Sequence, residues 1–307
     1  MKRIVRIHVI LLLGVILLGG RTLHAQTAMY YNATLHFLQV GQVDSAKADV
    51  EKLMAAPGAK SDPDNWYLYG VVLKEMYKTY ERNNFDSPYR KQSVDAFKTS
   101  LKLDTVADRK KVTRDNLRFI AGTFYNDAVT TLDTSRYKTS IQCYEQYREV
   151  TLIVDSTFDI KKKDIEFYLA LASTYNTIYN LDKKKNAAFF DLTRDTYLKV
   201  LTWDPNNYMA NYSMSLLYWN KGVDLMYNID YDDSLTDVFG VQDHSVELFK
   251  QSLPFAEKAY TMEPNREETL IVLSGIYYSL NEFEKSKQYQ QMLDDLRKRN
   301  PGDGQQR

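Results

Sequence analysis

Residues 201–207 read Leu-Thr-Trp-Asp-Pro-Asn-Asn, and residues 260–265 read Tyr-Thr-Met-Glu-Pro-Asn. Each stretch closes an apolar helical pattern with an acidic residue, a proline and an asparagine, a combination that ends one helix and starts another. Apolar residues at helical spacing lie on both sides of each stretch. The two stretches therefore predict an all-α chain whose helices are joined at short seams.

The composition favours the same fold class. The 307 residues include only 12 glycines and 7 prolines, fewer than collagen-like, low-complexity or turn-dense all-β chains contain. The single cysteine, Cys143, excludes an intramolecular disulfide framework and is expected to be a buried small residue of a helix. Because 40 Lys and Arg balance 40 Asp and Glu, no basic excess favours nucleic acid as a partner.

Residues 1–25 have the layout of a secretory signal peptide. Lys2, Arg3 and Arg6 precede an apolar run of 12 residues, 9–20, and the segment ends at Ala25, which predicts cleavage after that residue. The run is shorter than the roughly 20 residues that span a bilayer, and no later segment is long and apolar enough. We therefore expect an exported protein in the periplasm of a Gram-negative bacterium, without stable membrane insertion after cleavage. The outer surface or the medium is the alternative location.

An internal repeat accompanies the seams. The chain reads Trp66-x2-Tyr69-Gly70-x2-Leu73 near its start, and a related pattern of large apolar and small residues recurs after each seam. This pattern resembles the tetratricopeptide repeat (TPR) family, which implies antiparallel helix hairpins that stack into an α-solenoid. Small residues such as Gly70 let the two helices of a hairpin approach closely, while neighbouring Tyr and Leu side chains fill the space between them.

The repeats predict about six hairpins in a single solenoid domain over residues 26–300, with inserts in the middle repeats and a disordered tail over 301–307. In the fifth hairpin we expect a short helix that contains Val246, Leu248 and Phe249 and ends before Ser252, which caps the next helix. A separate helix then starts at Leu253, which places Pro254 in its first turn, where a proline costs no hydrogen bond.

Four Asp-Ser/Thr triplets, at 44–46, 104–106, 155–157 and 233–235, are similar to the O-glycosylation sites of secreted Bacteroidetes proteins. The chain thus resembles a secreted, Bacteroidetes-like TPR protein. Helix capping and turn formation explain the same triplets, and we favour that interpretation.

The sequence contains little that could perform catalysis. No glycine-rich phosphate loop is present, and His36 and His244 have no zinc-ligand spacing. The run Asn228-x-Asp230-x-Asp232 resembles the start of a calcium loop but lacks its central glycine and its closing glutamate. We therefore predict no catalytic residue, no metal site, no cofactor and no enzyme activity.

The first helices of TPR hairpins line a concave groove, so the resemblance implies which residues face a partner. The residues that match these positions form an aromatic and amide surface: Tyr31, Tyr67, Lys74, Arg118, Tyr125, Asn126, Asn176, Tyr212, Trp219, Asn220 and Tyr278. Tyr, Trp and Arg dominate binding energy at protein interfaces. The alternative is that some of these side chains pack under the inserts. The carboxylate clamp of some TPR domains is not expected, because Tyr31 and Leu35 stand where it requires Lys and Asn.

The leading hypothesis is a non-catalytic scaffold or adaptor of the cell envelope that binds a peptide or protein partner along the groove. A glycan-handling surface protein and a self-assembling structural component, in which the inserts form homo-oligomers, remain open as alternatives.

Overall fold

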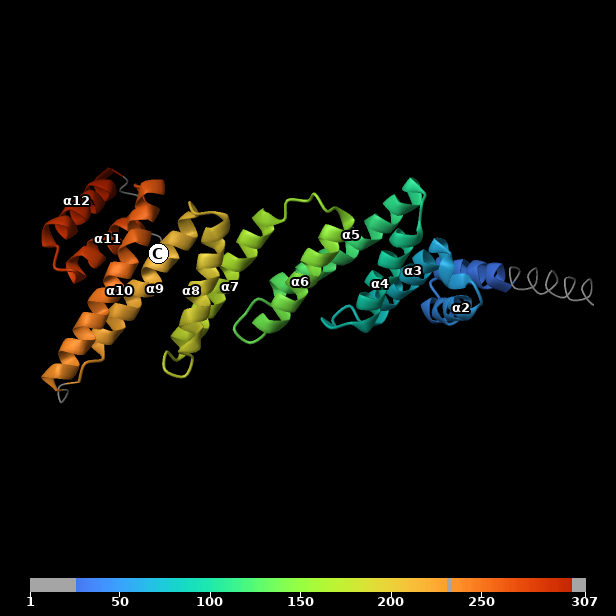
Figure 1. The fold of residues 1–307 in the computed structure, drawn as a ribbon, viewed down its shortest axis with the longest axis horizontal. Helices are drawn as coiled ribbons and strands as arrows, with labels where there is room; N and C mark the ends of the chain where they lie inside the picture. The colour runs from blue at the N-terminus through green and yellow to red at the C-terminus, as the bar shows by residue number, and fades with distance from the viewer. Residues whose placement is uncertain (1–25, 231–233, 300–307) are drawn as a thin grey trace, which may run out of the picture. The chain divides into compact units, whose positions relative to one another are not determined.

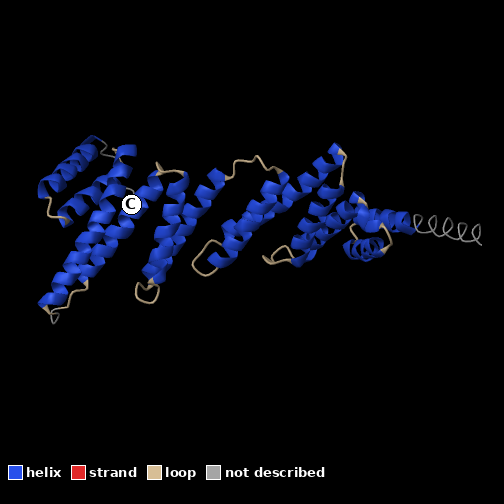
Figure 2. Ribbon diagram, viewed as in Figure 1, coloured by secondary structure: helices blue, strands red, loops and turns tan. Residues whose placement is uncertain are grey.

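The computed structural model describes residues 26–230 and 234–299 (Figure 1). These residues form α-helices, one 3₁₀ turn and short connections, without a strand (Figure 2). The predicted all-α fold class is confirmed. The predicted signal peptide and the tail over 301–307 lie outside the described residues.

The helices follow one another along the chain with few intervening residues. A helix over residues 26–39 comes first. It is followed by α2 (Val43–Ala55), η1 (Ala59–Ser61), α3 (Pro63–Tyr80), α4 (Pro88–Leu103), α5 (Ala107–Thr130), α6 (Tyr137–Val154), α7 (Lys161–Leu181), α8 (Ala188–Trp203), α9 (Tyr208–Tyr227), α10 (Leu235–Met262), α11 (Glu267–Ser279) and α12 (Phe283–Arg299).

The described residues divide into two compact units. The first comprises residues 26–131 and 138–158, and the second comprises 132–137 and the described residues from 159 onward. Each unit holds three consecutive helix hairpins, in agreement with the six predicted. Whether the units act as one continuous domain stays a prediction. No helix in the described ranges combines the length and the apolar character that crossing a membrane requires.

Helix ends in both units follow from local sequence. Asp62 accepts a hydrogen bond from the Asp64 amide at 2.9 Å and caps α3, whose first residue is Pro63. Ser87 caps α4 in the same way ahead of Pro88. A proline at the first helical position loses no hydrogen bond, because that amide has no partner inside the helix.

Within a hairpin, a small residue on one helix receives an aromatic ring from the other. A Cβ atom added to Gly70 of α3 would lie 2.8 Å from the Phe97 ring of α4, and one added to Gly222 of α9 would lie 2.6 Å from the Phe249 ring of α10. Ser93 of α4 also donates to the Gly70 carbonyl at 2.8 Å. These contacts hold the two backbones close together, as the repeat pattern predicts.

The structure corrects the prediction for the fifth hairpin. The segment from Leu235 to Met262 is one helix, α10, with Pro254 in its interior, so the expected break before Leu253 is wrong. Ser252 is not a cap: its hydroxyl donates to the Ser215 carbonyl of α9 at 2.7 Å. Burial of α10 side chains on both sides of Pro254 offsets the roughly 3 kcal/mol that an interior proline costs.

Candidate partner-binding faces

The first helices of successive hairpins are neighbours within each unit. In the first unit α3 contacts α5, and in the second unit α9 contacts both α7 and α11. The exposed sides of these helices form two surfaces, which we name the α3/α5 face and the α9/α11 face. Nine of the eleven predicted groove residues lie on α3, α5, α9 and α11. The other two are Tyr31, on the helix over 26–39, and the half-buried Asn176, on α7.

On the α3/α5 face, one amide joins two of the predicted residues. The Nζ of Lys74 donates to Oδ1 of Asn116 at 2.7 Å, and Nδ2 of Asn116 lies 3.5 Å from the hydroxyl of Tyr67. Lys74 also pairs with Glu75 at 3.4 Å. Burial raises the pKa of Tyr67, so its phenol is neutral at physiological pH. These contacts connect α3 to α5 and fix both side chains in position.

The other predicted residues of this face lie further along α5. Arg118 and Asn126 are exposed, and Arg118 forms an ion pair with Asp115. Tyr125 is half-buried, and its ring centroid lies 5.0 Å from that of Tyr147 on α6. Arg118 and Asn126 are thus accessible to a partner, whereas Tyr125 divides its surface between packing and solvent.

Tyr31 has a different environment. It is half-buried and packs against the core shared by α2 and α3. Burial raises its pKa, and Asp64 and Asp62 act in the same direction. Tyr31 therefore contributes more to packing than the prediction assumed.

On the α9/α11 face, the predicted aromatic residues have unequal roles. Trp219 lies against Gly275 of α11, where an added Cβ would be 2.4 Å from its Cζ2, and its Nε1 donates to Ser279 at 3.3 Å. Tyr212 and Trp219 both pack against the core of the last hairpins. In contrast, Tyr278 is 65% exposed, and Asn220 is also exposed. Only Tyr278 and Asn220 can be replaced here without disturbing the core.

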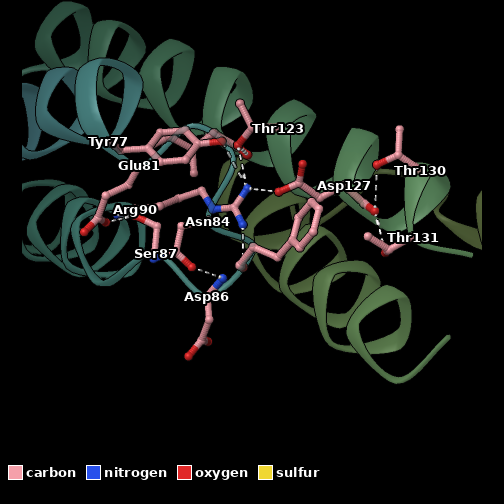
Figure 3. A network of polar contacts seen from close by, with 12 residues as sticks. Tyr77, Glu81, Asn84, Asp86, Ser87, Arg90, Thr123, Asp127, Thr130 and Thr131 are labelled. Atoms are coloured by element: carbon pink, nitrogen blue, oxygen red, sulfur yellow. Dashed lines mark hydrogen bonds and ion pairs between the residues drawn. The ribbon is translucent and has the colours of Figure 1, made fainter. Parts of the chain in front are cut away.

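Behind the α3/α5 face, a buried arginine fastens α3, α4 and α5 together (Figure 3). Arg90 of α4 is fully buried, and its Nη1 lies 2.5 Å from the Asp127 carboxylate of α5 and 3.2 Å from the Tyr77 hydroxyl of α3. Its Nη2 donates to the Phe85 carbonyl at 2.7 Å. The guanidinium carbon lies 4.0 Å from the Phe124 ring centroid, within cation–π range.

Sequence reasoning missed Arg90, although a signal was present. Positions 90, 93, 94 and 97 share the i, i+3, i+4, i+7 spacing of one helix face, and the last three are a small residue and two apolar residues. A cation in such a stripe must find a partner when it is buried. The same reasoning also missed Phe119 and Gly122, which lie on α5 at helical spacing from the predicted Asn126, and Asn116, which lies three residues before Phe119.

Cys143 is buried, as predicted. It lines a cavity of about 400 Å³ in the first unit. Burial raises the pKa of its thiol, while the guanidinium of Arg90 acts in the opposite direction. The cavity also borders Phe85, Asp86, Lys91, Phe124, Ile141, Gln142, Glu145 and Gln146.

Polar side chains elsewhere have local roles. Within the described ranges, no three His, Cys, Asp or Glu side chains are grouped so that they could hold a metal ion. Asn228 donates to the Asp224 carbonyl at 2.6 Å, and Asp232 and Asp233 of the calcium-like run lie outside the described residues. Asp155 accepts hydrogen bonds from Thr157 at 2.7 and 2.9 Å, the turn geometry that we favoured for the triplets.

Comparisons with known proteins give distant likenesses. Neither a family model nor a curated protein matches the chain. Among solved structures, the chain is similar to an IFIT1 monomeric mutant with m7Gppp-AAAA, at 13% identity and a TM-score of 0.33. The match covers 85% of this chain but only 58% of IFIT1. The P58(IPK) TPR domain matches at 11% identity and a TM-score of 0.22, over 92% of this chain and 99% of that domain. The hairpins described above, and not these likenesses, establish the fold.

Proposed function

We propose that this chain is a non-catalytic protein-interaction scaffold that binds a peptide or protein partner along the exposed sides of its first helices. The observation that carries the proposal is the α3/α5 face. There Lys74, Asn116 and Tyr67 are held in place by their mutual contacts, beside the exposed ring of Phe119, whose centroid lies 5.8 Å from the Lys74 ammonium group. Side chains that are already fixed lose less entropy on binding, so such a surface suits a partner better than a mobile one.

The α9/α11 face supports the same proposal. Tyr278 is exposed and its ring meets that of Phe283 edge-on at 5.5 Å, which limits its movement. A rigid, accessible tyrosine offers a large contact area with few rotatable bonds. A helical hairpin array thus presents anchor residues in both units.

We further propose that the scaffold acts in the cell envelope, in the periplasm of a Gram-negative bacterium. The support is the leader-like pattern of residues 1–25. Fractionation of cells that express the tagged full chain, with N-terminal sequencing of the product, tests the location. A product that retains residue 1 and stays in the cytoplasm would contradict export.

The binding proposal is tested by crosslinked capture from cell envelopes with quantitative mass spectrometry. The variants are Arg118→Ala/Asn126→Ala on the first face and Asn220→Ala/Tyr278→Ala on the second, which replace exposed side chains. Glu284→Ala/Lys287→Ala, two exposed residues of α12, is the matched control.

We expect the wild type and the control to capture the same protein, and at least one face variant to lose it by about tenfold, the effect of about 1.4 kcal/mol. Unchanged capture by both face variants, with circular dichroism like that of the wild type, would refute the proposal. Light scattering on the same samples distinguishes capture of a partner from self-association.

A further inference from the structure

The repeat pattern gives pairs of equivalent positions in the two units. Gly70 and Ser215 are the small motif residues of α3 and α9, and four residues later come Lys74 and Trp219. In the next first helix of each unit the small motif residue is Ala121 of α5 or Ser274 of α11. Each is followed directly by a glycine, Gly122 or Gly275. Lys74 and Gly122 in the first unit therefore correspond to Trp219 and Gly275 in the second.

In the second unit this pair forms a filled contact. The indole of Trp219 occupies the space where a Gly275 side chain would begin, with Cζ2 and Cη2 at 2.4 and 2.8 Å from an ideal Cβ. The glycine is therefore a packing residue, and its α11 backbone serves as a platform for an aromatic ring.

In the first unit the equivalent space, beside Gly122, is open. A Cβ added to Gly122 would have no atom of another residue within 4 Å, apart from its chain neighbours and the α5 backbone. The equivalent Lys74 does not cover the glycine, because its ammonium group is bound to Asn116, six residues earlier on α5. A glycine inside a helix is less stable than alanine, and no neighbouring side chain requires it here.

The surroundings of Gly122 indicate what could occupy this place. Arg118 and Phe119 lie four and three residues before it, and Tyr125 and Asn126 lie three and four residues after it, so all share its helix face. Phe119 is 47% exposed. The environment is thus aromatic, accessible and backed by an uncovered helix backbone.

The charges beside this place are more positive than negative. The ammonium groups of Lys74 and Lys78 lie 5.8 and 5.9 Å from the Phe119 ring centroid. With Arg114 and Arg118 they make four cations, against the carboxylates of Glu75, Asp115 and Asp155, the last of which interacts electrostatically with both arginines. Carboxylates next to the occupant would be favoured over ammonium groups.

We infer that Gly122 is a socket for an aromatic side chain of a bound peptide, with acidic residues beside that side chain. The ring would lie on the α5 backbone as Trp219 lies on α11, between Phe119 and Tyr125. This inference rests on the proposed function and names the side chain that the α3/α5 face recognises.

Selective ¹⁵N-glycine labelling of the mature chain tests the socket, because a ring laid on a backbone shifts the adjacent amide signal. Three capped tripeptides serve as probes: Glu-Trp-Glu, Glu-Ala-Glu and Lys-Trp-Lys. The Gly122 signal is assigned as the one that Gly122→Ala removes. We expect Glu-Trp-Glu to shift Gly122 in a saturable manner while the signals of Gly70 and Gly275, which are covered by rings, stay in place.

The alanine peptide should leave the Gly122 signal unchanged, and the lysine peptide should bind more weakly than Glu-Trp-Glu. A Gly122 signal that stays fixed at millimolar Glu-Trp-Glu, or that moves equally with the alanine peptide, would overturn the socket. Equal affinity for the two tryptophan peptides would overturn the acidic preference.

A variant pair supplies the second measurement. Gly122→Ala fills the socket with a methyl group and is expected to lower Glu-Trp-Glu affinity about fivefold, within the range for aromatic contacts. Gly240→Ala is the matched control, because Gly240 is also in a helix with open space around it but lies on α10. Affinity unaffected by Gly122→Ala would overturn the inference. If envelope capture still depends on Arg118 and Asn126, the proposed function survives that failure.

Discussion

Replacing Asp127 by alanine should destabilise the first unit more than any exposed substitution in it. The change removes the carboxylate that lies 2.5 Å from Nη1 of Arg90 and leaves a fully buried guanidinium without its counter-charge. The remaining acceptors for that group are neutral: the Tyr77 hydroxyl at 3.2 Å, the Thr123 hydroxyl at 3.4 Å and the Phe85 carbonyl.

The size of the effect follows from burial. Two unit charges about 4 Å apart interact by about 4 kcal/mol at an effective dielectric constant of about 20. Breaking a buried pair from one side typically costs about 3–5 kcal/mol, because a charge is left uncompensated. The Asp127 side chain is 16% exposed, so water can reach the vacated space, and we expect about 3 kcal/mol.

Two further variants separate the charge effect from lost packing. Arg90→Met/Asp127→Leu removes both charges and keeps apolar volume, so it should cost less than Asp127→Ala alone. Asp115→Ala removes the ion pair between Asp115 and Arg118, whose side chains are 53% and 58% exposed, respectively. It should reduce the free energy of unfolding by only about 0–1 kcal/mol.

Native-state hydrogen exchange read by mass spectrometry is the assay, because it reports the two units separately. We expect the free energy of opening to fall in peptides from α3, α4 and α5 and to stay unchanged in peptides from α9 and α11. A loss below about 1 kcal/mol for Asp127→Ala, or a double variant as unstable as the single one, would refute the argument from an uncompensated buried charge.

Three other predictions concern single positions. Gly275→Ala should reduce the free energy of unfolding by about 1–3 kcal/mol, and so lower the urea midpoint, because the new methyl group meets the indole of Trp219 on α9. Gly240→Ala has open space around it and should increase the free energy of unfolding by about 0.5–1 kcal/mol. The thiol of Cys143, buried and with a raised pKa, should react more slowly with an aromatic disulfide at pH 8 in the native protein than in urea; equal rates would contradict its burial. Nη2 of Arg109 lies 2.9 Å from Oδ1 of the buried Asp104, and this contact lowers the pKa of the Asp104 carboxyl. The stability that the pair contributes is therefore complete above the pKa of about 4 that Asp has in the unfolded chain. It is lost as the pH falls through the lower pKa of the folded state. Urea midpoints measured from pH 7 to pH 3 should therefore fall less steeply for Asp104→Asn than for the wild type.

The sequence alone predicted the fold class and the helix boundaries at the two seams, because the signals for them are local. The seam at Pro205 precedes α9, which begins at Tyr208, and the seam at Pro264 precedes α11, which begins at Glu267. Proline, acidic and asparagine residues act within one or two turns of the chain, so their effect needs no knowledge of the tertiary structure. Pro254 shows the limit: packing of α10 against its neighbours decided that this helix continues.

The candidate site depended on tertiary structure to a greater extent. Lys74, Trp219 and Tyr278 occupy the same position of the repeat, four residues after its small residue, and the sequence assigned all three to one groove. In the structure Lys74 bridges to Asn116, Trp219 covers Gly275, and Tyr278 is exposed because no later first helix follows α11 in the described residues.

The sequence by itself thus determined that this protein is a series of helix hairpins, and it predicted an aromatic and amide surface on their first helices. The tertiary structure decided which of those side chains are available to a partner. The physical reason is that spacing along a helix fixes the direction of a side chain. Whether that side chain is covered depends on what the neighbouring helix places opposite it: a glycine, an amide, or nothing but solvent.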